Sequence, residues 1–181
     1  MADRPIVVDA SAAVAPLRDE PTAPEVSRIL RTAGATSTRR LVPRFFWLEV
    51  VNVLARRHRY SSEELMRALA ILDELGLETV DQGRPELLLV VDLVERHRLT
   101  AYDATYLALA QTADARLLTA DRRLAEAAGD RAILVGGGNT IAEEPVEYAE
   151  PSWISWPSAA AYLEAARERV YRWAEESGSR D

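Results

Sequence analysis

Apolar residues occur along the chain in short runs and in longer stretches of helical spacing. The first run, Ile6–Val8, is short and β-branched, which is typical of a buried strand. An alanine-rich, helix-prone stretch follows from Ser11, and a second helical pattern runs from residue 24 until Gly34 ends it. The pattern therefore predicts a strand followed by two helices.

The same alternation continues to Val135. Further strands are predicted around Leu41 and Val42, over 77–80, around Leu117 and Leu118, and over 132–135. Further helices are predicted over 45–59, 62–75 with Ser61 or Ser62 as its cap, 85–98, and from near Asp103 and Asp121. Alternating elements of these lengths predict an α/β fold with a parallel sheet covered by helices on both faces, in which ligands bind at the carboxyl ends of the strands.

The pattern changes after Val135. Residues 136–156 contain three glycines, four glutamates and two tryptophans with little periodicity, which predicts an acidic linker or arm. Helical spacing returns afterwards, so residues 157–181 are predicted to form an amphipathic helix and tail. This tail can complete the core, extend a dimer interface or lie over a basic surface. The predicted organisation is thus an α/β domain over 1–135, an arm over 136–156 and a C-terminal helical extension.

The amino-acid composition excludes several classes of function. With 181 residues, 48% of them hydrophobic, the chain fits one globular domain, and it has neither a membrane-length apolar stretch nor a secretory signal pattern, so we expect a cytoplasmic protein with no membrane partner. The absence of cysteine excludes disulfides, thiol nucleophiles and cysteine-bound metals. The absence of lysine excludes P-loop phosphate binding and Schiff-base chemistry.

The net charge of −7 is unevenly distributed along the chain. Residues 1–135 have 18 arginines against 20 acids, whereas residues 136–181 have 4 arginines against 9 acids. Most of the excess acidity therefore belongs to the tail. All basic residues are arginines, for which a coding bias is one explanation; their planar guanidinium groups nevertheless suit phosphate binding.

Four acids stand out because each is embedded in apolar sequence: Asp9, Glu49, Asp103 and Asp121. Taken singly, each has a structural explanation, as a helix N-cap, a helix-edge residue or a turn after a strand. Taken together, they suggest a different chemistry. A hydrolytic phosphoryl-transfer site without lysine, cysteine or a well-placed histidine needs metal ions, and hard divalent cations take oxygen ligands.

These four motifs, VVDASA, the ExxN spacing of Glu49 and Asn52, YDATYLALA and LLTADRRLA, resemble the PIN-domain family in residue type and order from residue 4 to about 135. The resemblance implies a PIN-like three-layer α/β/α sandwich in which Asp9, Glu49, Asp103 and Asp121 line one acidic pocket. It also implies a Mg²⁺- or Mn²⁺-dependent endoribonuclease, most similar to a VapC-type toxin of a toxin–antitoxin pair. Its expected partners are RNA, a VapB-like antitoxin and a second copy of the chain.

Other residues have supporting roles by the same resemblance. Ser11 and Thr119 are expected to donate hydrogen bonds to a ligand or water, and Asn52 to orient Glu49 or a metal-bound water; helix capping is an equal alternative for Ser11. Arginines near the motifs are expected to contact RNA or antitoxin, or else to lie on a solvated surface: Arg40, Arg44, Arg122 and Arg123.

Three alternative functions stay open or are excluded by particular residues. The chain can be a PIN ribonuclease of RNA processing outside a toxin–antitoxin pair, which the extra tail allows, or a catalytically silent PIN-like binding scaffold, which the intact acidic set disfavours. A haloacid-dehalogenase-type phosphatase also begins with an acid after the first strand, but it needs a second Asp where this chain has Ser11.

Overall fold

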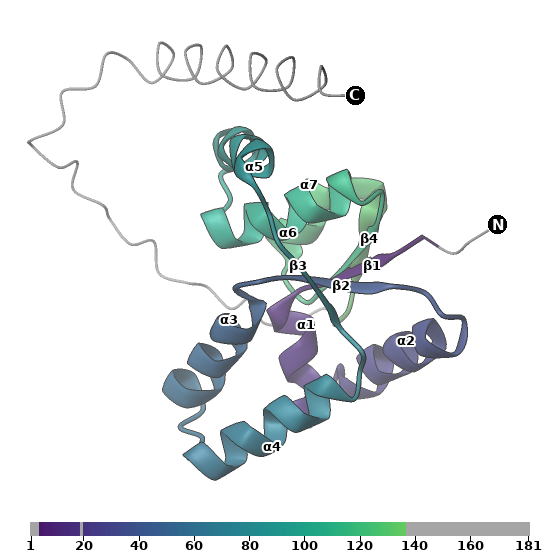
Figure 1. Ribbon diagram of the computed structural model, residues 1–181, viewed down its shortest axis with the longest axis vertical. Coiled ribbons are helices and arrows are strands. Elements are labelled where there is room, and N and C mark those ends of the chain that lie inside the picture. Colours follow the sequence, from purple (N-terminus) through teal and green to yellow (C-terminus); the bar gives the residue numbers. More distant parts are fainter. Residues whose placement is uncertain (1–3, 19, 137–181) are drawn as a thin grey trace, which may run out of the picture. The chain divides into compact units, whose positions relative to one another are not determined.

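The apolar runs form one parallel sheet that lies between the helices of the described domain (Figure 1). The computed structural model describes residues 4–18 and 20–136. Within them, five strands pair in the order β3-β2-β1-β4-β5, and every pairing is parallel. The strands are β1 (Ile6–Val8), β2 (Arg40–Pro43), β3 (Glu78–Val80), β4 (Arg116–Thr119) and β5 (Ala132–Leu134).

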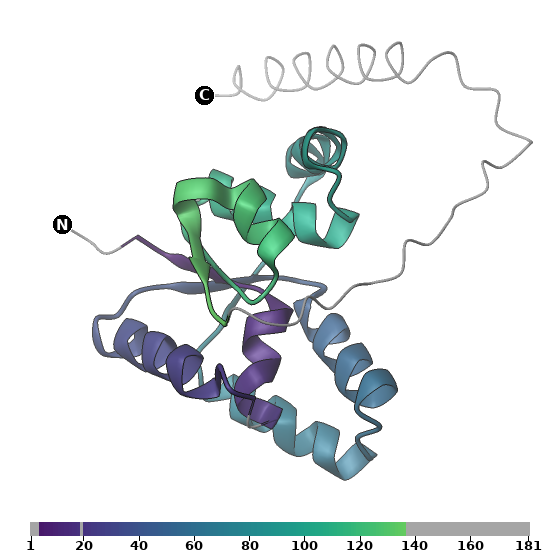
Figure 2. The same cartoon turned by 180° about the vertical axis from the view of Figure 1, so that it is seen from behind.

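Helices cover both faces of this sheet, with α1 to α4 on one side and α5 to α7 on the other (Figures 1 and 2). The first group comprises α1 (Ala10–Val14), the 3₁₀ turn η1 (Ala15–Arg18), α2 (Ala23–Ala35), α3 (Phe46–Asn52), the π segment η2 (Val53–Arg57) and α4 (Ser62–Asp73). The second comprises α5 (Arg84–His97), α6 (Ala101–Thr112), α7 (Arg122–Ala128) and the 3₁₀ turn η3 (Gly129–Arg131). The predicted three-layer α/β/α architecture is confirmed.

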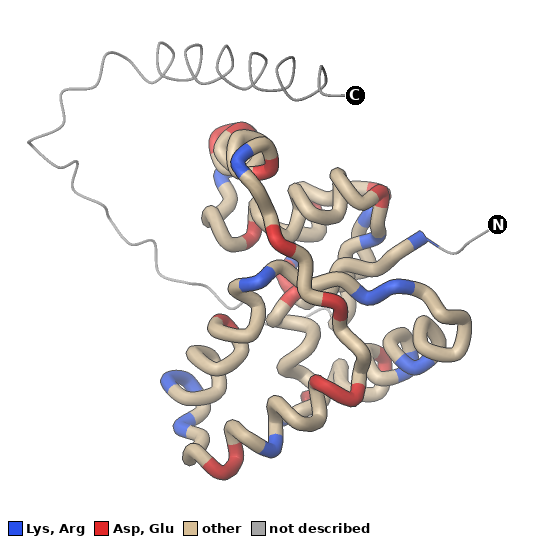
Figure 3. The backbone as a smooth tube through the Cα atoms, viewed as in Figure 1, with Lys and Arg blue, Asp and Glu red and all other residues tan. Residues whose placement is uncertain are grey.

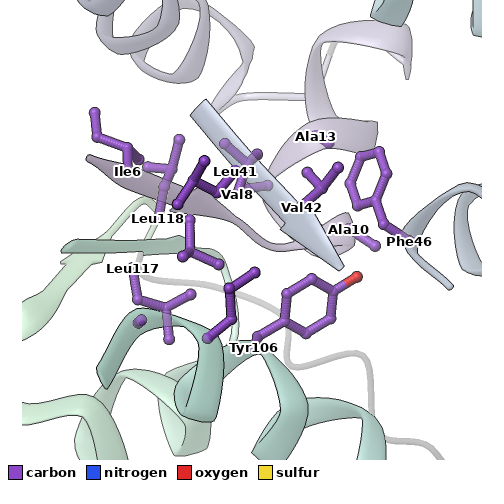
Figure 4. Close-up of a cluster of buried hydrophobic side chains, with 14 of the residues drawn as sticks. Ile6, Val8, Ala10, Ala13, Leu41, Val42, Phe46, Tyr106, Leu117 and Leu118 are labelled. Carbon is purple, nitrogen blue, oxygen red and sulfur yellow. The ribbon is translucent and has the colours of Figure 1, made fainter. Parts of the chain in front are cut away.

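The core lies where the central strands meet the helices on either face. Val7, Val8, Leu117 and Leu118 are fully buried, as expected for strands that are covered on both sides. Figure 4 shows side chains of β1, β2 and β4 packed together, with the ring of Tyr106 from α6 among them. This packing fixes the carboxyl ends of β1 and β4 side by side.

Two predicted helices differ from the structure in their details. The helix predicted over 45–59 is regular only through Asn52, and it continues as the wider π segment η2. The helix predicted from near Asp103 begins earlier, because the Thr100 side chain caps it and accepts a hydrogen bond from the Asp103 amide at 3.1 Å. Of the two residues predicted as possible caps of α4, Ser61 is the cap and Ser62 is the first residue of the helix.

Of the predicted acidic arm and C-terminal helix, residues 137–181 lie outside the described residues. Among the residues that are described, no helix is both long enough and apolar enough to cross a bilayer.

Candidate metal centre

Asp9 is the most buried of the four candidate acids, with 4% of its surface exposed. It follows β1 directly, and its amide extends the β1–β4 pairing by donating to the Leu118 carbonyl at 3.0 Å. The Thr119 hydroxyl donates to its Oδ2 atom at 2.7 Å, and the Ser11 hydroxyl donates to the same oxygen. Burial nevertheless raises the pKa of Asp9, and these hydrogen bonds only partly oppose that increase.

Asp121 lies beside Asp9 because β4 is the sheet neighbour of β1. Its amide donates to Thr119 Oγ1 at 3.0 Å, and the amide of Ala120 donates to Ser11 Oγ at 3.0 Å. The charge of Asp121 also contributes to the raised pKa of Asp9. Asp9, Ser11, Thr119 and Asp121 therefore form one hydrogen-bonded group at the carboxyl ends of two adjacent strands.

Asp121 also performs the structural role that was considered for it. Its Oδ1 atom accepts a hydrogen bond from the Leu124 amide at 3.0 Å, and this contact caps α7. Ser11, in contrast, is not the residue at the N-cap position of α1, which is Asp9. The Ser11 side chain instead joins the β1 end to the β4 end.

Glu49, on α3, is linked to this group by a residue that the sequence reasoning missed. The hydroxyl of Tyr106, a fully buried residue of α6, donates to Glu49 Oε2 at 2.6 Å. Burial raises the pKa of Tyr106 well above its ordinary value, and the charges of Asp9 and Glu49 raise it further. In Figure 4 its hydroxyl oxygen points toward Ala10, the residue after Asp9. The Tyr106 hydroxyl therefore binds Glu49 and is close enough to Asp9 for that charge to affect its pKa.

Asp103 occupies the first turn of α6, one turn before Tyr106. The Thr100 hydroxyl donates to Asp103 Oδ2 at 2.9 Å, so this carboxylate is held at the start of the helix. Residues three apart on a helix share a face, which places Asp103 on the Tyr106 side of α6. This spacing of Asp103 and Tyr106 within YDATY is the feature of the sequence that could have placed Tyr106 at the site.

The oxygen atoms gathered here suit a hard divalent ion in their chemistry, but among the described residues too few acids are grouped to surround the ion fully. The atoms gathered at this edge are carboxylate and hydroxyl oxygens, which Mg²⁺ and Mn²⁺ prefer. In the described part of the chain, however, no three acidic or histidine side chains are grouped closely enough to hold one ion together. Mg²⁺ is commonly held by one or two carboxylates and several waters, so the Asp9–Asp121 pair satisfies that need. The larger four-acid ligand set stays a prediction.

The remaining predicted residues lie at different places. Asn52 is exposed at the end of α3, one turn beyond Glu49. Arg44 follows β2 at the same edge of the sheet as Asp9, where it forms an ion pair with Asp81. Arg122 is exposed on the first turn of α7, and Arg123 donates to the Arg98 carbonyl at 2.7 Å.

Arg40 is not brought near the acids. It begins β2 in register with Ile6 at the start of β1, so it lies at the opposite edge of the sheet from Asp9. Its guanidinium packs beside Gly34 and Gly76, where a Cβ atom on Gly34 would approach Arg40 Nη1 to 3.0 Å.

Comparison with known proteins gives a family and a fold. A family model described as "PIN domain" matches residues 6–130. The crystal structure of PAE2754 from Pyrobaculum aerophilum is similar, with a TM-score of 0.52 and 22% sequence identity over 71% of this chain and 87% of that chain. At this identity the likeness shows the fold alone. Curated proteins yielded no match to the sequence.

Proposed function

The chain belongs to the PIN-domain family, and from this premise we propose that it is a Mg²⁺- or Mn²⁺-dependent endoribonuclease, the VapC-type toxin of a toxin–antitoxin pair. PIN domains are generally nucleases and typically use divalent metal ions. The observation that carries the proposal is the hydrogen-bonded group of Asp9, Thr119 and Asp121 at one sheet edge, with Glu49 bound by Tyr106, whose pKa the charge of Asp9 raises.

The chain's own residues supply an oriented anionic site. Thr119 and Ser11 both donate to Asp9 Oδ2, which fixes the plane of that carboxylate. Tyr106 orients Glu49, and α7 holds Asp121 at its N-cap. A bound Mg²⁺ or Mn²⁺ would supply an activated water and stabilise the departing oxygen. We propose Asp9, Glu49, Asp103 and Asp121 as the ion's ligands, directly or through water.

The test is manganese-dependent cleavage of RNA by the full chain. Asp9→Asn and Asp103→Asn are each expected to reduce the cleavage rate by on the order of 100-fold, because each loses an ionised oxygen donor at the site. Asp73→Asn, which changes an exposed carboxyl at the end of α4, is the matched control and should cleave like the unaltered chain.

RNA binding without metal-dependent cleavage by the unaltered chain would overturn the nuclease proposal in favour of a catalytically silent scaffold. A toxin should be inhibited when the small protein encoded directly upstream is co-expressed with it. Cleavage that persists in this experiment would favour a PIN ribonuclease of RNA processing.

We also propose a VapB-like antitoxin and a second copy of the chain as partners, with Arg44, Arg122 and Arg123 contacting RNA or antitoxin. The domain organisation proposed with them is a nuclease domain over 1–135 followed by an acidic arm and a helix. Light scattering coupled to size-exclusion chromatography tests the dimer, and a monomeric mass at micromolar concentration would contradict it.

A further inference from the structure

A cavity of about 420 Å³ adjoins the candidate metal centre. Ser11 and Asp121 form part of its wall, so it is continuous with the group that surrounds Asp9. Its other polar lining comes from a different part of the chain: Arg18, Thr22, Arg57 and His58, with Glu20 beside Arg18. The cavity therefore joins an acidic wall to a wall that contains cationic and hydroxyl groups.

The π segment η2 brings two of these groups to the cavity. It continues α3, the helix of Glu49, and its last residue is Arg57, followed by His58. The Tyr60 hydroxyl donates to the Leu17 carbonyl at 3.0 Å, which ties the end of this segment to the η1 turn that bears Arg18. Interruptions of this kind in a helix are frequent at functional sites.

The charges around the cavity are separated: Arg18 and Arg57 lie on one side with Glu20 paired to Arg18, and Asp121 lies on the side of the acids. Partial burial lowers the pKa of His58, and the nearby charges of Arg18 and Arg57 lower it further, whereas Glu20 opposes them. Burial is the main cause, and the two arginines add to it because both lie on the His58 side of the cavity. Arg18 forms an ion pair with Glu20, which leaves Arg57 as the principal cation for a ligand.

An unsatisfied hydroxyl points to the same conclusion. The Thr22 Oγ1 atom is buried, and within the described residues no hydrogen-bond partner contacts it. A buried hydroxyl without a partner has a free-energy cost, which a ligand oxygen can remove when its binding displaces the atoms that cover the hydroxyl. A guanidinium and a hydroxyl around one cavity match the oxygens of a phosphate.

We propose that this cavity binds a backbone phosphate of the RNA strand, next to the phosphate that is cleaved at the acids. Arg57 is the main anchor and the Thr22 hydroxyl a second donor. The inference rests on the proposed function, because it assigns part of that function's substrate. It makes Arg57 and Thr22 positioning residues that set where the strand lies relative to Asp121.

The first test needs no cleavage. The chain has two histidines, His58 and His97, so a proton NMR titration with inorganic phosphate in a phosphate-free buffer reads both at once. We expect a saturable shift of the His58 ring resonance, no shift of His97 at the end of α5, and loss of the His58 shift in Arg57→Ala. Arg56→Ala, which changes the neighbouring arginine that does not line the cavity, should retain it.

The second test uses cleavage. Single neutral methylphosphonate linkages are placed in turn along a short RNA substrate. The neutral linkage should lower kcat/KM by about tenfold when it stands next to the cleaved phosphate, which is the loss expected for one charge-assisted hydrogen bond. In Arg57→Ala this position should no longer matter, whereas Arg56→Ala should behave like the unaltered chain.

The outcomes separate the two proposals. No cleavage of any RNA, together with a phosphate-dependent His58 shift, would sink the nuclease function and with it the substrate assignment, although the anion site would stand. Cleavage with no effect of Arg57→Ala at any linkage would overturn the cavity proposal alone. Phosphate that shifts neither histidine would also overturn it.

Discussion

A single buried hydroxyl binds one acid of the site and responds to the charge of another. Tyr106 packs in the core through its ring and donates to Glu49 through its oxygen, while its pKa records the charge of Asp9 as well. Phe45 supports the ring in an edge-to-face contact, with 5.3 Å between centroids. Tyr106 is therefore a positioning residue, which links the core to the site.

Tyr106→Phe should separate these two roles. The ring still fills its place, so the fold should remain, but Glu49 loses a hydrogen bond to a charged group, worth about 1.5–3 kcal/mol. We expect cleavage to fall by roughly tenfold and the Mn²⁺ concentration for half-maximal activity to rise. Metal titrations of the cleavage rate measure both effects.

Tyr102→Phe is the control for this change, because it removes an exposed hydroxyl from the same helix. Unchanged metal dependence in Tyr106→Phe would mean that its hydroxyl does not orient Glu49.

At the scale of elements, the site is built from strand ends and from helix ends. β1 and β4 end at Val8, directly before Asp9, and at Thr119, while α6 and α7 begin at Ala101 and Arg122. The separate helix α4 has its own cap, in which Ser61 and Glu64 exchange hydrogen bonds with each other's backbone amides. Stability and activity can therefore be altered through different helix ends.

Ser61→Ala should lower the free energy of unfolding by about 1 kcal/mol, because the Glu64 amide loses its acceptor at the start of α4. Cleavage by the folded protein should be unchanged. Urea unfolding measures the stability, and Ser62→Ala, at the next position, is expected to cost less because Ser62 is not the cap residue. Equal losses in the two variants would contradict the assigned cap.

Much of this arrangement could be predicted from local sequence. The strand runs and the acids that follow them depend on neighbouring residues, and each was predicted. For the cap of α4 the sequence left Ser61 and Ser62 as alternatives, and the structure has Ser61. The π segment could not be predicted in this way, because residues 45–59 have one continuous helical pattern in which nothing marks the widening at Val53. The contact of Tyr60 with Leu17, just beyond the segment, is a tertiary one that local sequence does not reveal.

Residues that depend on strand direction and pairing were harder to place. Arg40 and Arg44 are close in sequence and were both assigned to the rim of the acidic site. A strand separates them, so the parallel sheet carries them to opposite edges. Tyr106 was missed because a tyrosine in an apolar helix has the pattern of a core residue, which it also is.

At the scale of the whole molecule, charges of both signs are interspersed over the described helices and loops (Figure 3). The acids at the sheet edge are different, since Asp9 is buried and close to the charge of Asp121. Its folded-state pKa is raised above its ordinary value of 3.8, so the folded protein holds this proton more tightly than the unfolded chain does. Without metal, stability therefore falls as pH rises from about that value through the raised pKa.

Asp9→Asn removes the loss of stability that ionisation of the buried Asp9 causes. At neutral pH in EDTA we expect its melting temperature to exceed that of the unaltered chain by about 2–4 °C, equivalent to roughly 1 kcal/mol for a protein of this size. The difference should shrink as pH falls toward the ordinary pKa of Asp9. Added Mn²⁺ should stabilise the unaltered chain, by about 2.7 kcal/mol at a hundredfold excess over Kd, and the variant much less.

Circular dichroism melts across pH, with and without Mn²⁺, test these expectations. The matched Asp73→Asn control should melt like the unaltered chain at every pH. If Asp9→Asn melted below the unaltered chain at neutral pH in EDTA, charge repulsion and burial at Asp9 could not be the dominant effect.

The pairing of β1 with β4 has a consequence for how the protein is made. The hydrogen bond from Thr119 to Asp9 joins residues 110 positions apart, and the sheet places these two strands side by side although β2 and β3 come between them in the sequence. Contacts this distant form late, after much of the chain is available. A ribosome that has synthesised only the first hundred residues has therefore produced no Thr119 or Asp121. Nascent fragments of a protein proposed to destroy RNA would be harmless to the messenger that encodes it.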